Sequence, residues 1–123
     1  RSLRRAVLAR IAAEVTDLGG RVFDRAVAGT QHPYCTLGPS DWSPRDADCI
    51  EGRLYALQLD IWHSAAAKGA LEDLVDDVAA SLRELEVQEI PMHPFRVALA
   101  RIMDDPSGDL HGVVQIEALI EGG

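Results

Sequence analysis

The segment Arg53–Ser64, with the sequence RLYALQLDIWHS, decides the fold of this chain. Apolar side chains recur at every second position along it, at Tyr55, Leu57, Leu59 and Ile61. This period of two predicts a β-strand with one face against a core. The opposite face carries Gln58 and Asp60, so it is too polar to lie deep beneath helices. We therefore expect that face to meet solvent or a partner.

The composition of the 123 residues bounds the class of protein. Hydrophobic residues make up 47% of the chain, which predicts one globular domain over residues 1–123. The formal net charge of −8 excludes binding driven by nucleic-acid phosphates, although it is compatible with DNA that passes nearby without being bound. The apolar runs are too short to span a membrane. Arg10 and Glu14 interrupt the N-terminal apolar stretch, which favours an amphipathic helix over a signal peptide. We therefore expect the protein to be assembled in the cytoplasm.

Helical and strand-like periods divide the rest of the chain. Apolar residues at steps of three and four predict helices over 3–18 and from about Ser64 to 85. Three further strands are predicted over 33–39, 95–103 and 110–120, with a short extended piece at 22–23. In the run 95–103, Phe95, Val97 and Leu99 share one predicted face. The polar, turn-rich residues 41–52 predict a long exposed loop.

This order, α-β-β-α-β-β, predicts an α+β fold. Two helices would pack on one face of a small, mostly antiparallel sheet of about four strands. A sheet of that size has edges, which are either protected or used to pair with another chain.

Patterns typical of catalysis and cofactor binding are missing from the sequence. Four histidines accompany Cys35 and Cys49, but their spacings match no short zinc-ligand pattern, and no glycine-rich phosphate loop occurs. The acidic residues of the second helix, which include Asp73 and Asp76, are typical of a solvated helix face. A Cys–His nucleophile pair stays open as an alternative, with a buried, inert Cys35 preferred. We predict no catalytic residue, no metal and no cofactor.

Several sequence blocks resemble one known family. They are Val22-Phe23-Asp24, Pro33-Tyr34-Cys35-Thr36-Leu37-Gly38, Leu57-Gln58-Leu59-Asp60-Ile61-Trp62-His63, Asp104 with Gly108, and His111-Gly112-Val113-Val114. In order and spacing they resemble the tail completion or tail terminator proteins of long-tailed phages, across nearly the whole chain. One departure is Ala26-Val27, where that family would have a proline, and the stretch 28–32 is short.

The resemblance implies a structural role in a phage or phage-like particle. Such a protein caps the finished tail tube as a hexameric ring, ends tube polymerisation and offers a surface for joining the head. Its partners would be further copies of itself, the tail tube protein and the head or neck connector proteins. It would sit at the head-proximal end of the virion tail, without catalytic residues, cofactor or membrane. Prophages and gene transfer agents carry similar proteins, so the particle need not be infectious.

Tryptophan is enriched at the centres of interfaces, and long loops and hairpin tips often reach partners. We therefore expect the loop 41–52, the turn 104–109 and the end of the central strand to contact a neighbour. The candidate interface residues are Trp42, Arg45, Asp46, Asp48, Trp62, Asp104, Asp105 and Asp109. Two alternatives stay open: a head-completion or neck protein, and a small α+β enzyme or ligand-binding domain with a Cys–His or carboxylate site.

Overall fold

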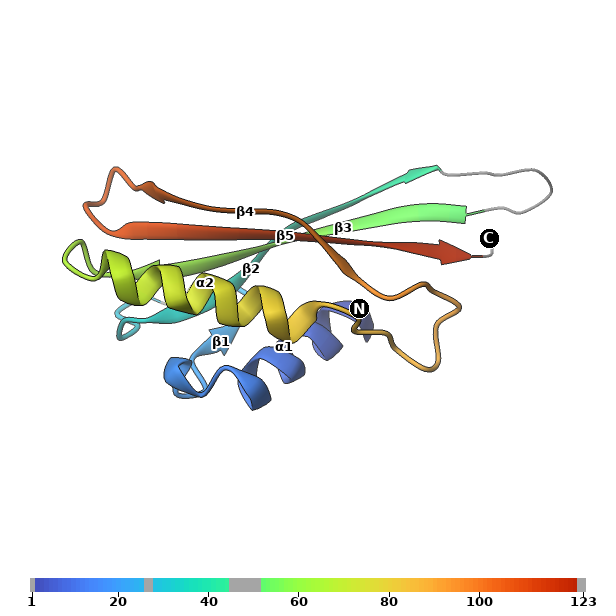
Figure 1. Ribbon diagram of the computed structural model, residues 1–123, viewed down its shortest axis with the longest axis horizontal. Helices are drawn as coiled ribbons and strands as arrows, with labels where there is room; N and C mark the ends of the chain where they lie inside the picture. Colours follow the sequence, from blue (N-terminus) through green and yellow to red (C-terminus); the bar gives the residue numbers. More distant parts are fainter. Residues whose placement is uncertain (1, 26–27, 45–51, 122–123) are drawn as a thin grey trace.

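The computed structural model describes residues 2–25, 28–44 and 52–121. Helices and strands follow one another along these residues (Figure 1). In chain order they are α1 (Ser2–Glu14), a 3₁₀ turn (Thr16–Leu18), β1 (Val22–Phe23), β2 (Tyr34–Pro44), β3 (Gly52–His63), α2 (Lys68–Leu82), β4 (Arg96–Asp104) and β5 (Leu110–Glu121). The predicted α+β class is confirmed.

The described strands form one sheet in the order β1-β2-β3-β5-β4. The predicted central strand is β3, which lies in the middle of the sheet and pairs with β2 and β5. The pairings β2–β3, β3–β5 and β5–β4 are antiparallel, whereas β1 runs parallel to β2. The expectation of about four strands therefore falls one short, because the two-residue piece at Val22–Phe23 is a strand of the sheet.

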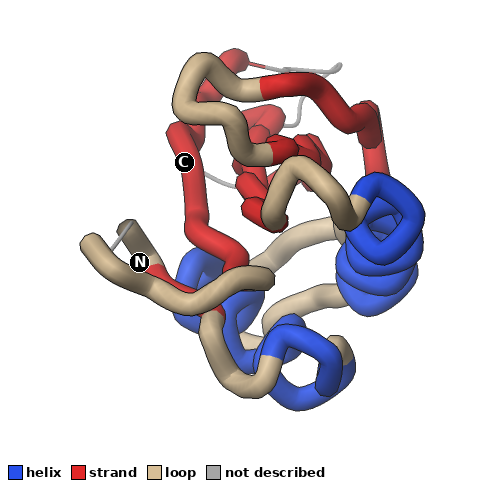
Figure 2. Tube along the Cα trace, turned by 90° about the vertical axis from the view of Figure 1, so that its left-hand side faces the viewer, coloured by secondary structure: helices blue, strands red, loops and turns tan. Residues whose placement is uncertain are grey.

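Both described helices lie on one side of the twisted sheet (Figures 1 and 2). The helix-covered face of β3 is the predicted one, since Tyr55, Leu57, Leu59 and Ile61 are all buried. They join the apolar stripes of α1 and α2 and the inward residues of β5 in one core. None of the described helices has both the length and the apolar character needed to cross a membrane.

The first helix is shorter than predicted. It ends at Glu14, and residues Thr16–Leu18 form a 3₁₀ turn instead of continuing it. Gly19 adopts a left-handed conformation with φ 59° and donates its N–H to Thr16 O at 2.9 Å. This turn lets Leu18, which is fully buried, reach the core from a chain that is changing direction. The second helix begins at Lys68, after a turn closed by Ala67 N–H on Ser64 O at 3.0 Å.

The predicted loop over residues 41–52 is wrong for its first part. Strand β2 continues past Pro39 to Pro44, which pairs with Arg53 at the far end of β3. The register shifts between Leu37 and Ser40, so the proline lies in a bulge where it is not required to donate to the ladder. Residues 45–51 lie outside the described residues. In Figure 1 the ends of β2, β3 and β5 run past the helices.

A second bulge corrects the predicted faces of β4. The register against β5 shifts between Val97 and Leu99, so the strand gains one residue there. Phe95 is buried and Val97 packs against the core, as expected, but Leu99 is turned to the other face and is 38% exposed. Ile102 takes the inward position instead. A single inserted residue reverses the facing of everything beyond it.

Candidate assembly surfaces

Four aromatic rings from distant parts of the chain stack on the sheet face that the helices leave uncovered. We call His32, Tyr34, Trp62 and His111 the ring stack. Adjacent ring centroids are 5.6 Å apart for His32–Tyr34, 6.4 Å for Tyr34–Trp62 and 4.0 Å for Trp62–His111. The sheet register produces this arrangement, because Tyr34 is opposite Trp62 and Trp62 is opposite His111. The stack therefore crosses β2, β3 and β5 and ties the three strands together.

Carboxylates hold both ends of the ring stack. At one end, Asp60 Oδ1 lies 2.7 Å from His111 Nε2 and accepts a hydrogen bond from Gln58 Nε2 at 2.8 Å. At the other end, Asp109 Oδ2 lies 3.0 Å from His32 Nε2. Asp60 is 9% exposed, so its carboxylate is held in place by these partners and is largely shielded from water.

Burial and nearby charges fix the protonation of the rings around the stack. Burial raises the pKa of Tyr34, and the carboxylates of Asp109 and Asp105 raise it further. Burial lowers the pKa of His63, and the neighbouring His32 lowers it further. Both shifts favour the neutral form near pH 7. Tyr34 and His63 therefore contribute packing and hydrogen-bonding capacity here, and they are poorly placed to carry charge.

Three of the predicted interface residues belong to the β4–β5 hairpin. Asp109 contacts the ring stack directly through His32. Asp105 shapes the turn, because its Oδ2 accepts the N–H of Ser107 at 3.0 Å, and its hydrogen bonds with Ser107 lower its pKa. Asp104 is the last residue of β4 and is exposed. The hairpin tip thus carries carboxylates near the ring stack.

The two tryptophans, which the sequence singles out together, lie on opposite faces of the sheet. Trp62 belongs to the ring stack, and its Nε1 donates to Thr36 Oγ1 at 3.4 Å. Trp42 is opposite Tyr55 near the far ends of β2 and β3 and is 52% exposed. Its ring meets that of Tyr55 edge-on at 4.9 Å, and the Arg53 guanidinium lies 4.2 Å from its centroid. Arg45, Asp46 and Asp48 lie outside the described residues.

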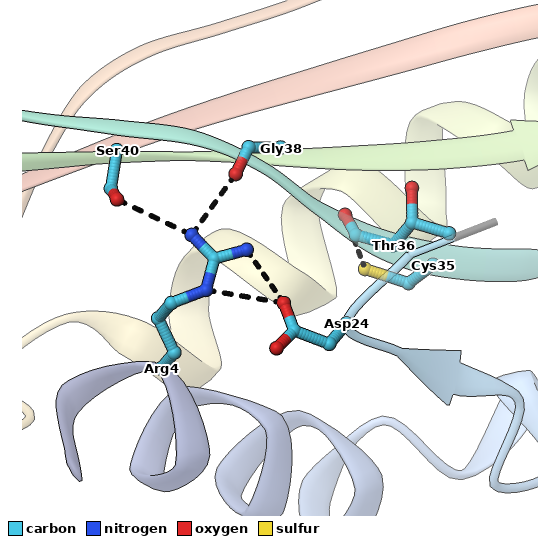
Figure 3. Close-up of polar contacts among 6 residues, drawn as sticks. All are labelled: Arg4, Asp24, Cys35, Thr36, Gly38 and Ser40. Atoms are coloured by element: carbon cyan, nitrogen blue, oxygen red, sulfur yellow. Dashed lines mark hydrogen bonds and ion pairs between the residues drawn. The ribbon is translucent and has the colours of Figure 1, made fainter. Parts of the chain in front are cut away.

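Arg4 joins α1 to the β2 bulge, a contact that sequence reasoning missed. Its Nη2 and Nε donate to Asp24 Oδ1 at 2.6 and 3.1 Å (Figure 3). Its Nη1 donates to Gly38 O at 3.1 Å and to Ser40 Oγ at 3.4 Å. The one indication in the sequence is an arginine in the first turn of a helix. Positive charge there interacts unfavourably with the helix dipole, so a nearby carboxylate would stabilise it.

Two glycines of the sequence blocks are required by close contacts. A Cβ at Gly38 would lie 2.7 Å from Asp60 Oδ2, and one at Gly112 would lie 2.6 Å from Val75 Cγ2. Gly38 lets the β2 bulge approach Asp60, which holds the His111 end of the ring stack. Gly112 lets α2 pack directly on β5.

Cys35 has neither the access nor the charge state of a nucleophile. Its side chain is fully buried, and burial, with a smaller contribution from Asp60, raises its pKa to about 12. The reactive form of a cysteine is the exposed thiolate. Cys35 is therefore a core residue, as preferred from the sequence. In the described ranges, no three histidine, cysteine or acidic side chains are grouped so as to hold a metal ion.

Comparison with known proteins agrees with these observations. The model of the family described as "Tail completion protein gp17" matches residues 5–121. A chain in the structure described as "Virion of native gene transfer agent (GTA) particle" has the same fold, with a TM-score of 0.82. It is 19% identical, and the match covers 98% of this chain and 95% of that one. No curated protein matches the sequence significantly.

Proposed function

Since this chain belongs to the tail completion protein family, we propose that it forms a closed ring on the head-proximal end of a tail tube. The ring ends tube polymerisation and offers the surface on which the head or neck is joined. We take the ring to contain six copies, with the tube protein on one side and connector proteins on the other. DNA passes through it without specific contacts.

Membership of this family makes the chain a structural protein of the virion tail and not an enzyme. The details of the fold support that role. Residues of the family-like blocks contribute to each of the contacts described above. Tyr34, Trp62 and His111 supply three of the four rings of the ring stack, Asp24 and Gly38 accept hydrogen bonds from Arg4, and Gly112 allows the close approach of α2 to the sheet. Their chemistry is used to fix the relative positions of strands and helices. A rigid subunit of defined shape is what an ordered ring requires.

The observation that carries the ring proposal is the presence of two unlike edges on one sheet. At one edge, the described part of β4 has β5 on one side and no strand on the other. At the opposite edge, β1 covers β2 only at Cys35 and Thr36, so residues 40–43 have β3 as their one neighbouring strand in the described part of the chain. Exposed edges are templates for pairing with another chain. Contacts between two different surfaces of one subunit generate rings when the rotation closes.

Particles made without this protein test the proposal. Loss of a terminator should give tails that vary in length and exceed the normal length, with tube subunits continuing past the usual end. Electron micrographs of particles from a deletion strain would measure this directly. Tails of normal length beside separate, filled heads would instead indicate a joining role, and the termination part of the proposal would then be wrong. Re-expression of the wild-type chain should restore the normal tail length and serves as the control.

A further inference from the structure

Two depressions lie at opposite edges of the sheet. One is lined by residues of α2 and β4, namely Glu72, Val75, Asp76, Ala100, Arg101 and Ile102. We call it the α2/β4 groove. The other is lined by Arg4, Arg5 and Leu8 of α1 together with Asp24, which follows β1. We call it the α1/β1 patch. Because β1 and β4 are the two terminal strands of the sheet, these surfaces lie at its opposite edges.

The two surfaces carry opposite charge. Among the groove residues, two carboxylates, Glu72 and Asp76, stand against one guanidinium, that of Arg101. In the patch, Arg4 is neutralised by its ion pair with Asp24, at 2.6 Å, which leaves Arg5 as the excess charge.

The wider surroundings strengthen the difference in charge. Residues 68–82 contain four acidic residues and one lysine, whereas residues 2–25 contain five arginines and three acidic residues in a chain of net charge −8. In the described residues, the four carboxylates of α2 form no ion pair, and neither does exposed Arg5.

The start of α1 also points to an acidic neighbour. Its first turn contains no acidic residue, and Arg4 and Arg5 place positive charge at the positive end of the helix dipole. Within the subunit, Arg4 forms an ion pair with Asp24. Arg5 has no such partner among the described residues, and Leu8 beside it is half-buried. A half-buried apolar side chain beside a cation that has no ion pair among the described residues suits a groove whose lining combines apolar side chains with an excess of carboxylates.

We propose that the α2/β4 groove of one copy receives the α1/β1 patch of the next copy around the ring. Arg5 then lies between Glu72 and Asp76 of its neighbour, and Leu8 packs toward Val75 and Ile102. The contact joins two different surfaces, so it repeats head to tail and can close. Complementary charges also select the correct partner edge, because like edges brought together repel. This inference rests on the proposed ring and names the surfaces that build it.

Charge reversal tests this interface, with copies retained on purified tail tubes as the measurement. Asp76→Arg should place a cation where Arg5 must dock, and Arg5→Glu should place an anion in an acidic groove. Each variant alone is expected to lose at least tenfold in copies bound per tube end. The matched controls are Asp73→Arg on the same helix and Arg83→Glu just beyond it, both exposed and outside the groove. Both controls should assemble as the wild type does.

Mixing the two variants tests whether the groove and the patch meet each other in the ring. In an equimolar mixture, the reversed groove of Asp76→Arg faces the reversed patch of Arg5→Glu, and the two unaltered surfaces face each other. Rings with an even number of subunits should therefore return, with the two variants in equal amounts. Circular dichroism and melting temperature show beforehand that each variant folds.

The possible failures are distinguishable. If the wild type assembles and folded variants behave like it, or the mixture fails to recover, the interface is wrong and the ring proposal stands. If the wild type forms no ring on tubes, both are wrong.

Discussion

The two faces of β3 are built on different principles. The helix-covered face repeats one simple rule, an aliphatic or aromatic side chain at every second residue, and each of these positions is buried. The uncovered face depends on particular pairs, such as Asp60 with His111 and Trp62 with Thr36. The burial of the helix-covered face can be predicted from whether each residue is apolar or polar. The arrangement of the uncovered face depends on which residue stands opposite which, and so on the register of three strands.

The largest expected effect comes from the helix-covered face. Leu57→Ala removes a side chain that is 1% exposed, so the free energy of unfolding should fall by roughly 2–5 kcal/mol. Leu54→Ala, on the other face of the same strand and half-buried, is the matched control and should cost less than half as much. Denaturant unfolding of both variants measures the difference. Equal losses would mean that the two faces do not differ in the way described.

Gly112→Ala probes the contact between α2 and β5. The added methyl group would lie 2.6 Å from Val75 Cγ2, so the helix must shift, at a cost of about 1–3 kcal/mol in the free energy of unfolding. Gly69→Ala is the control, because a Cβ there meets nothing within 4 Å and the position is helical. That change should leave stability equal or raise it by up to about 1 kcal/mol. A neutral Gly112→Ala would show that α2 is not seated tightly on the sheet.

Asp60→Ala tests whether the uncovered face contributes through its specific pairs. It leaves the Gln58 amide and the His111 ring without their shared acceptor on a largely shielded surface, which should cost roughly 1–3 kcal/mol. Asp77→Ala, at an exposed carboxylate of α2, should change the free energy of unfolding by less than about 0.5 kcal/mol. If Asp60→Ala were as silent as that control, the network would be an incidental arrangement of side chains.

The smallest expected effect, when the comparison is confined to pH 9–10, is a loss of stability in alkali that originates at Cys35. Its pKa is raised from 9.0 to about 12 in the folded chain, so above pH 9 the unfolded chain releases a proton that the folded chain keeps. Stability is therefore intact below pH 9 and declines as pH rises toward 12, by about 1 kcal/mol between pH 9 and 10. A Cys35→Val variant should lack this part of the decline, with both proteins carrying Cys49→Ser. Parallel stability–pH curves would contradict the shift.

Much of the fold could be predicted from the spacing of apolar residues and from the turn-forming residues between them. The strand at 53–64, the second helical stripe and the hairpin around 104–109 all follow from residue spacing, and each is present. The first helix ends earlier than predicted and β1 adds a strand, and two further errors occur at the bulges near Pro39 and Ala98, where one strand gains residues relative to its partner. A bulge shows itself in pairing, and a single strand's sequence does not reveal its partner's register. The bulge turns Leu99 to the other face of the sheet, and the sequence of β4 alone does not predict this.

The candidate surface could be predicted only in fragments. The sequence points to Trp62 and Asp109 separately, one as an interface tryptophan and one as a loop carboxylate. The structure relates them through His32 and Tyr34, which alternation alone does not bring near either residue. The Arg4–Asp24 ion pair likewise joins residues 20 positions apart. Contacts of this kind depend on tertiary placement, so composition and spacing carry little information about them.

The central claim is that the chain works as a shaped subunit that associates with its own kind at one place in the tail. Electron microscopy of intact particles, averaged around the tail axis, measures the position and copy number of this protein most directly. We predict a single closed layer of six copies where the tube meets the head, with α1 of each copy against α2 of its neighbour. Copies spread along the tube, or particles that lack the protein altogether, would contradict the claim.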